Sequence, residues 1–408
     1  MNKVFKIGSW VLPIVCMTIG LIACSDNSYK GFVMPSDNIP EENIPVMIAV
    51  GNPEINDIVS RGSGVIDQTD NDLWRNAYIY IYSFKRDMST NYSVLSTEDD
   101  KMCLIDASTQ EHSSKLGKKA KINGNETYIS WADGSENVFY HSNNLPYDFF
   151  GYYIDDMEIG EQEVIRTGEG VKLKVRIDGR QDLMSARASL TEEQANRKTY
   201  TEEERENIKE WYYSTYTAQR NIQPIMIFKH HLSRFIFRIY PARKDANEVI
   251  ITGIKVKSKR NGLFTVAHSV VGNMGVDFSE EQSYEDLSLL EKDGSPLLTD
   301  TYHTDYNGDF SESLYERPYV EVGGSLILPP EETSYDCEVE MKQTIDGTTH
   351  TYTSLTKLNN TEGVFKAGMQ YTIRLSIYGL QDVDATVVPT PWENGGEVVV
   401  DPDKDFGK

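Results

Sequence analysis

The residues of this chain that could perform chemistry are scattered and form no known catalytic motif. The sequence has 7 histidines and 4 cysteines among 408 residues. It contains no GxSxG nucleophile elbow, no HExxH pair, no phosphate-binding loop and no GxGxxG fingerprint. The histidine pair His230 and His231 lies in a strand-like pattern, where structural hydrogen bonds are commoner than metal ligation. We therefore expect no enzymatic activity and no cofactor.

Carboxylates leave two alternatives open. Two acidic runs resemble the start of a calcium-binding loop: Asp305, Asn307 and Asp309, and Asp401, Asp403 and Asp405. Both lack the glycine and the distal glutamate of an EF-hand loop, so solvated turns are the favoured interpretation and no metal is expected. With 63 acidic residues, a glycosidase-type pair of carboxylates stays open, although no pair stands out.

Arg61 offers a different chemistry, because Gly62, Ser63 and Gly64 follow it. A basic residue in a flexible, glycine-rich stretch is what a trypsin-like protease can draw into its cleft, and exposed stretches of small residues are preferred sites of nicking. The sequence therefore predicts cleavage between Arg61 and Gly62. An arginine in an ordinary surface linker is the alternative.

The N-terminus predicts export and lipidation. Lys3 and Lys6 precede an apolar run over residues 7–22, which is shorter than the roughly 20 residues of a membrane span and typical of a signal peptide. The run closes in LIAC, residues 21–24, which resembles the lipobox of bacterial lipoproteins. This resemblance implies removal of residues 1–23 and acylation of the Cys24 thiol. A plain signal peptide with a chance cysteine is the alternative.

Charge and cysteine usage argue against several functions. The formal net charge is −23, and it becomes more negative when Lys3 and Lys6 leave with the signal peptide. Such a chain is not expected to bind nucleic acid or an anionic membrane surface. Cys103 and Cys337 lie far apart in the sequence, so two separate buried side chains are expected, with a disulfide between them as the alternative.

The segments before Arg61 determine what cleavage would remove. Residues 25–43 are polar, contain two prolines and show no periodicity, which is typical of a tether. The next seven residues are an alternation of Ile44, Val46, Ile48 and Val50 with Pro45, Met47 and Ala49. A strand that is apolar on both faces is expected to be buried in a sheet sandwich.

Short strands dominate the rest of the chain. One run alternates Ala77, Ile79 and Ile81 with Tyr78, Tyr80 and Tyr82. Similar runs, separated by Gly, Asn, Asp and Ser, continue without a βαβ rhythm, which indicates antiparallel sandwiches. Residues 189–220 differ, because they are rich in Glu, Gln and Arg. Thr191 with Gln194, and Thr201 with Glu204, have capping-box spacing there, which predicts one or two inserted helices.

We therefore predict a mostly β chain with two tandem antiparallel β-sandwich domains and a helical insertion near 189–220. The predicted boundaries are 1–23 for the signal peptide, 24–61 for the tether and removable first strand, 62–222 for the N-terminal sandwich and 223–408 for the C-terminal sandwich.

The order of these features resembles the fimbrillin family, the pilins of type V fimbriae. The local patterns that carry the resemblance are WRNAYIYIYSF, YDFFGYYID, FKHHLSRFIFRI, and VFKAGMQYTIRLSI with PWENGG. In YDFFGYYID the proline that is usual in the family after the tyrosines is replaced by Ile154. The resemblance implies transthyretin-like, Greek-key sandwiches and an outer-membrane lipoprotein that becomes part of an extracellular fimbria on the cell surface.

The resemblance also implies a purpose for cleavage at Arg61. In that family an arginine-specific protease removes the lipid, the tether and the first strand, here residues 24–61. The emptied groove then receives a strand of the next subunit by β-augmentation. The candidate donor is EVVVD with Val398, Val399 and Val400, which residues 385–389 would extend; an ordinary edge strand is the alternative.

These inferences give a functional hypothesis and a rival. We expect a structural subunit of a fimbria, stalk or tip, that serves adhesion or biofilm formation. Its expected partners are other fimbrial subunits in a homo- or hetero-polymer, the protease, and the outer membrane through the lipid. The rival is a non-polymerising surface lipoprotein that binds glycans on its aromatic side chains.

Overall fold

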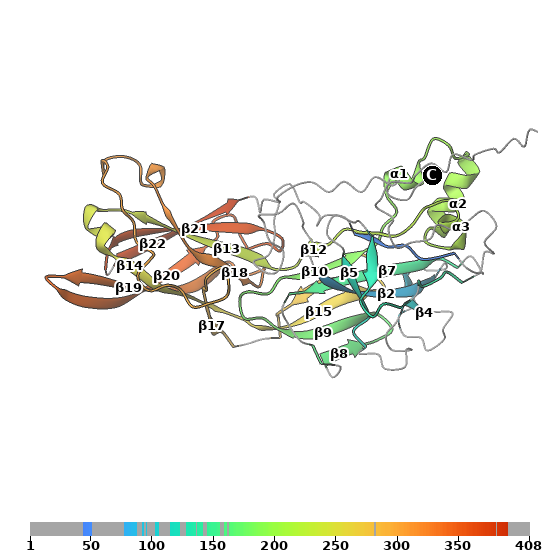
Figure 1. The fold of residues 1–408 in the computed structure, drawn as a ribbon, viewed down its shortest axis with the longest axis horizontal. Coiled ribbons are helices and arrows are strands. Elements are labelled where there is room, and N and C mark those ends of the chain that lie inside the picture. Colours follow the sequence, from blue (N-terminus) through green and yellow to red (C-terminus); the bar gives the residue numbers. More distant parts are fainter. Residues whose placement is uncertain are drawn as a thin grey trace, which may run out of the picture.

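The computed structural model describes residues 44–50, 77–87, 92–93, 95, 103–105, 115–122, 128–135, 137–141, 145–155, 159–160, 163–280, 283–380 and 382–390. Strands dominate these residues, so the predicted mostly β fold class is confirmed (Figure 1). None of the helices in these ranges is long and apolar enough to cross a membrane.

The elements of the first half of the chain are β1 (Ala49–Val50), β2 (Tyr78–Asp87), β3 (Tyr92–Ser93), β4 (Cys103–Ile105), β5 (Lys118–Ile122), β6 (Ile129–Trp131), β7 (Tyr147–Ile154), β8 (Val164–Arg166), β9 (Gly170–Arg176), β10 (Leu183–Arg187), α1 (Glu192–Ala195), α2 (Glu202–Trp211) and α3 (Thr215–Ala218). Those of the second half are β11 (Ile225–Met226), β12 (Lys229–His230), β13 (Ser233–Pro241), η5 (Lys244–Glu248), β14 (Ile250–Ser258), β15 (Asn261–His268), β16 (Gly275–Asp277), β17 (Glu285–Ser288), η6 (Leu314–Glu316), β18 (Val320–Leu328), β19 (Ser334–Ile345), β20 (Thr348–Asn359), β21 (Gln370–Gly379) and β22 (Asp382–Thr390).

The N-terminal sandwich is built on an eight-stranded sheet with the order β12-β10-β7-β2-β5-β6, in which β3 and β4 also pair with β2. All of these pairings are antiparallel. The predicted alternation of β2 is present, because Ile79 and Ile81 enter one apolar core and Tyr82 enters another. The sheet is therefore buried on both faces, which explains why β7, YDFFGYYI, shows no polar alternation.

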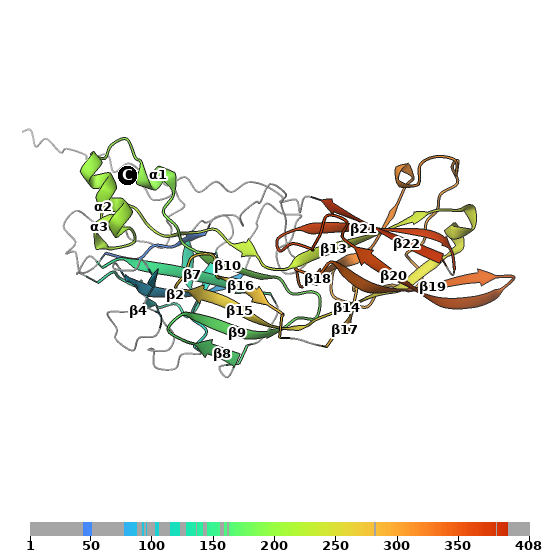
Figure 2. The same cartoon turned by 180° about the vertical axis from the view of Figure 1, so that it is seen from behind.

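Two different layers cover this sheet. On the face of Tyr82, the sheet β16-β15-β9-β8 packs across a core that includes Phe150 and Phe264. On the opposite face, residues 44–50, β11 and the helical insertion close a second core. Figures 1 and 2 show residues 44–50 as the dark blue trace beside the green helices. The predicted first strand thus forms part of the wall of a core.

The helical insertion is present and begins where the capping boxes predicted. Thr191 Oγ1 accepts from the Gln194 N–H at 3.1 Å, and Gln194 Oε1 accepts from the Thr191 N–H at 3.2 Å. The same reciprocal pair joins Thr201 and Glu204 at the start of α2. Each pair satisfies two backbone donors that a helix N-terminus would otherwise leave open.

The C-terminal sandwich encloses its own core between the sheets β18-β13-β21-β22 and β17-β14-β19-β20. The core side chains alternate along the strands, with Phe235, Phe237 and Ile239 from β13 facing inward. One pairing departs from the predicted antiparallel pattern, because β13 and β21 run parallel. Residues 385–389, the suggested extension of the donor strand, lie in β22 and pair with β21.

The boundary between the sandwiches is not the simple cut at residue 223 that the sequence suggested. β15 and β16 pair with β9 and belong to the first sandwich. The chain therefore crosses between sandwiches more than once, since β14 continues into β15 within three residues. The crossing is tightly packed: Ile327 N–H donates to Gly179 O at 2.7 Å, and a Cβ on Gly179 would meet Leu326 Cδ1 at 2.6 Å.

The two described cysteines lie in different cores. Cys103 belongs to the core beneath the second sheet of the N-terminal sandwich, and Cys337 belongs to the C-terminal core. Both are free thiols, so the alternative of a disulfide between them is wrong. Burial raises the pKa of Cys337 to about 12, which keeps this thiol protonated and inert.

Candidate functional site

The segment 44–50 is buried along its whole length. The four inward side chains, Ile44, Val46, Ile48 and Val50, are between 1% and 3% exposed. They pack into the core formed by Ile79, Ile81 and Phe149 of the central sheet. Met47 and Ala49, on the other side of the strand, are also buried. The predicted burial on both faces is confirmed, whereas only Ala49–Val50 of the segment forms a regular strand, β1, with an isolated bridge at Pro45.

Backbone hydrogen bonds hold one edge of the segment. The Val46 N–H donates to Val138 O at 2.8 Å, and Ile44 O accepts from the Tyr140 N–H at 2.9 Å. Further along, Ile48 O accepts from the Ile129 N–H of β6 at 3.2 Å. Bridges at Pro45 with Phe139 and at Ala49 with Tyr128 are antiparallel. The segment thus extends the edge of the eight-stranded sheet at β6.

The opposite edge runs parallel to β11. β1 pairs with β11 through Ala49 with Ile225 and Val50 with Met226, and the Ala49 N–H donates to Pro224 O at 3.0 Å. Because both edges are bonded, the segment lies in the interior of the sandwich as an extended chain that ends in β1. Its removal would leave donors and acceptors unpaired on two sides of an apolar groove. We call this groove, lined by residues 128–129, 138–140 and 223–226 and the core beneath, the slot.

One side chain, Gln223, completes the parallel edge. Its Oε1 accepts from the Met47 N–H at 3.2 Å, and its Nε2 donates to Pro45 O at 3.3 Å. The Tyr140 hydroxyl also reaches Gln223 Oε1 at 3.4 Å. The amide is 3% exposed. The sequence analysis missed Gln223, and only its place before Pro224 and an apolar pair hinted at a special role.

Gln223 is itself held by the helical insertion. Gln194, a member of the α1 capping box, donates from Nε2 to Gln223 O at 2.9 Å. Gln194 is fully buried. The start of α1, Gln223 and the strand in the slot are therefore linked by consecutive hydrogen bonds.

A buried ion cluster lies at one end of the central sheet. Asp148 of β7 accepts from Arg86 of β2 at 2.9 Å and from Arg187 of β10 at 2.9 Å. Arg86 and Asp148 are each 1% exposed, and the Arg86 guanidinium stacks over the Tyr212 ring at 3.5 Å. The cluster therefore joins three neighbouring strands to the residue that follows α2.

The histidine pair has structural partners. His230 Nδ1 lies 2.6 Å from Asp182 Oδ2, and His231 Nε2 lies 2.6 Å from the Ser185 hydroxyl. Burial lowers the pKa of His231 to about 4; the charge of Asp182 opposes this shift, and His230 and Lys229 add to it. His231 is therefore neutral in the folded chain at pH 7.

His231 predicts a loss of stability on acidification. Between pH 6.5 and pH 4 the His231 ring is protonated in the unfolded chain but stays neutral in the folded chain. The free energy of unfolding therefore falls as the pH falls, by at most about 1.4 kcal/mol per pH unit. The variant His231→Gln should show a shallower decline in urea denaturation between pH 7 and pH 4.5. His303, whose ring is exposed, supplies the control His303→Gln. Parallel curves for wild type and His231→Gln would contradict this assignment.

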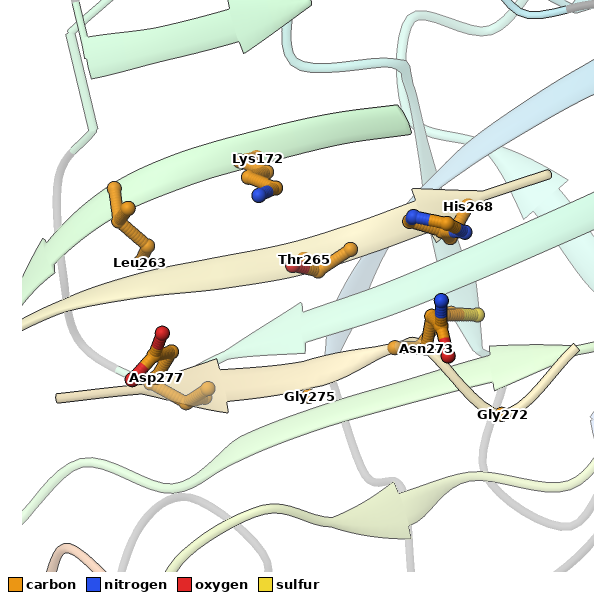
Figure 3. A pocket seen from close by; sticks show the side chains of 10 residues that line it. Lys172, Leu263, Thr265, His268, Gly272, Asn273, Gly275 and Asp277 are labelled. Carbon is orange, nitrogen blue, oxygen red and sulfur yellow. The ribbon is translucent and has the colours of Figure 1, made fainter. Parts of the chain in front are cut away.

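A shallow groove of about 410 Å³ lies over β9, β15 and β16 (Figure 3). Its polar side chains include Lys172, Thr265, His268, Asn273 and Asp277. A hydrogen bond from the Ser279 backbone N–H, at 2.7 Å, and the charge of Lys172 lower the pKa of Asp277. No tyrosine, tryptophan or phenylalanine lines this groove, so it lacks the stacking platform that the glycan-binding rival requires.

The acidic run Asp305, Asn307 and Asp309 forms a hydrogen-bonded turn. Asn307 donates to Asp305 Oδ1 at 3.3 Å, and the Ser311 N–H donates to Asp309 Oδ1 at 2.8 Å, which is the geometry of a polar turn. Within the described ranges no three ligating side chains gather as a metal site. The other run, Asp401, Asp403 and Asp405, lies outside the described residues, as do Cys24, Arg61, Gly62, Val398, Val399 and Val400.

Comparison with known proteins gives structural likenesses only. No protein-family model and no curated protein matches the sequence. A candidate cell adhesion protein from Bacteroides uniformis is 12% identical, with 88% of this chain and 100% of that chain covered and a TM-score of 0.45. The fimbrial anchor protein Mfa2 from Porphyromonas gingivalis is 11% identical, with 85% and 98% covered and a TM-score of 0.28.

A third solved structure, a fimbrial protein from Bacteroides ovatus, is 11% identical, with 89% of this chain covered and a TM-score of 0.30. This chain spans 56% of that protein's length. All three proteins are candidate adhesion or fimbrial proteins, the class that the sequence resemblance names. Since every TM-score is below 0.5, no assignment of this chain rests on them.

Proposed function

We propose that this chain is a structural subunit, stalk or tip, of a cell-surface fimbria. It is exported as an outer-membrane lipoprotein acylated at Cys24. Proteolysis between Arg61 and Gly62 separates residues 44–50 from the rest of the chain, and a strand of a neighbouring subunit then replaces them. The polymer serves adhesion or biofilm formation, and the chain is not an enzyme.

The observation that supports this proposal is the bonding of residues 44–50 in the slot. Residues 44–50 fill part of a core and are hydrogen-bonded at both edges. The last of them, Val50, lies only 11 positions before Arg61. If its four inward side chains each contribute about 1.5–3 kcal/mol, burial of the strand is worth roughly 6–12 kcal/mol before ordering costs. A replacing strand would recover a similar amount.

The same numbers explain why cleavage alone would not empty the slot at once. Before cleavage the strand is tethered, and its effective concentration at the slot is high. After cleavage it becomes a separate peptide, which dissociates slowly and is lost by dilution. Assembly should therefore lag behind cleavage, and it should be fastest at high subunit concentration.

Controlled proteolysis of the full chain tests the proposal. Cleavage by an arginine-specific protease should leave a stable fragment that begins at Gly62 and then forms ladders that resist mild detergent. Arg61→Lys should block both steps with that protease, whereas trypsin should restore both, because it cuts after lysine as well. This pair of proteases separates the effect of cleavage from the effect of the substitution.

A different result would count against the proposal. A fragment that begins at Gly62 and stays monomeric at high concentration would show that the slot does not support polymerisation. Ladders that form equally well with uncut Arg61→Ala would show that cleavage is not the switch.

A further inference from the structure

Gln223 hydrogen-bonds to residues 45–47 at the point where the backbone next to β11 cannot. Pro224 has no N–H to give to the strand, and Pro45 has none to give to the slot. The Gln223 side chain pairs with the strand at this gap, because its amide accepts from the Met47 N–H and donates to Pro45 O. A single side chain therefore acts as the hydrogen-bonding partner of two backbone groups that lie two residues apart.

We propose that Gln223 anchors the backbone of the strand in the slot, for the chain's own segment and for an incoming one, and excludes strands that bring proline or a carboxylate to the place of Met47. It requires a carbonyl at the place of Pro45 and an N–H at the place of Met47. A strand that brings proline to the place of Met47 is rejected, because the buried amide oxygen would lose its N–H donor. The part that concerns the incoming strand rests on the proposed function.

Burial next to Gln223 adds a second requirement. Met47 is 2% exposed and Ala49 is fully buried. A carboxylate at the place of Met47 would be desolvated beside the Gln223 oxygen, which is unfavourable without a cation. The slot therefore needs an uncharged residue with a free N–H at that place, flanked by apolar side chains at the places of Val46 and Ile48.

The requirement at the place of Met47 can be applied to the candidate donor EVVVD. If it runs in the direction of residues 44–50, three registers put both Val398 and Val400 in inward places. Two of them bring Asp401 or Glu397 to the place of Met47. The third brings Val399 there, with Val398 at the place of Val46. In this register Glu397 takes the place of Pro45, whose bridge partner is Phe139, and Asp401 takes the place of Ala49. The places of Pro45 and Ala49 are also buried, so burial there opposes this register while the contact with Gln223 favours it, and cross-linking decides which effect prevails.

Hydrogen exchange in the uncut full chain tests the Gln223 contact without any polymerisation. In Gln223→Met the Met47 amide should exchange about tenfold faster than in wild type, as expected for the loss of one buried hydrogen bond. The Val46 amide, which donates to Val138, and the Phe237 amide of the second sandwich should change far less. Gln219→Met, at an exposed position, is the matched control. Equal acceleration of Met47 and Val46 would reduce Gln223 to a general structural residue and overturn the inference.

Cysteine cross-linking of cleaved subunits tests the register and needs no change at Gln223. Bridge partners lie close enough for a disulfide, so Glu397→Cys should link to Phe139→Cys of the neighbour. A link from Val399→Cys or Gly395→Cys to Phe139→Cys would show another register and overturn it. If no polymer forms, the proposed function fails, while hydrogen exchange still decides the role of Gln223 in the chain's own strand.

Discussion

Replacing Ile48 with aspartate is expected to unfold much of the N-terminal sandwich. Ile48 is 1% exposed and packs in the core under the slot. Truncating a buried isoleucine costs about 2–5 kcal/mol, and an unpaired carboxylate adds its own desolvation cost. The loss should therefore be at least about 4 kcal/mol, a large part of the roughly 5–15 kcal/mol that stabilises a typical domain.

The effect of Ile48→Asp should be measured by hydrogen exchange of the Ile81 amide, which lies in the central strand β2 and in the same core. Leu355→Asp is the matched control, because Leu355 is 75% exposed on β20 and surface changes usually stay within about 0.5 kcal/mol. Both variants add the same charge. If Ile81 exchanges alike in the two variants, residues 44–50 do not stabilise the sandwich and the slot has no role.

Replacing Asp148 with alanine is expected to be the other strongly destabilising change. Asp148 holds Arg86 and Arg187, and its side chain and that of Arg86 are almost completely buried. Removing one partner of a buried ion pair costs about 3–5 kcal/mol, because the remaining charge is left desolvated. We expect a fall of that size in the free energy of unfolding, measured by urea denaturation.

The control for Asp148 is Asp336→Ala, which breaks a pair with Lys357 whose two side chains are more than half exposed. Exposed pairs are worth about 0–1 kcal/mol. The double variant Arg86→Met with Asp148→Leu should recover part of the loss, because it removes both buried charges and leaves Arg187, which is less deeply buried. Failure of Asp148→Ala to exceed Asp336→Ala would contradict the importance of the cluster.

Several elements could be predicted because their physical cause is local. The period of two in β2 separates Ile79 and Ile81 from Tyr82 wherever the strand is placed. The capping boxes at Thr191 and Thr201 follow from spacing alone, because both partners lie in one turn. Residues 44–50 were predicted to be a buried strand for the same reason, since seven apolar residues in a row have no solvent-facing side.

Other features could not be predicted because their partners are far apart in the sequence. Gln223 lies 176 positions after Met47, and a lone glutamine carries no pattern that reports such a contact. The assignment of β15 and β16 to the first sandwich has the same origin. β15 alternates like any other strand, and only packing decides which of two sheets it joins.

The sequence by itself therefore determined the strands, the insertion and the apolar character of residues 44–50, because hydrophobic period and capping act within a few residues. Tertiary structure alone decided that residues 44–50 are bonded at both edges, that Gln223 hydrogen-bonds to their backbone, and that Asp148 pairs with two arginines. Those features depend on distances between remote residues, which are set by the packing of the sheets.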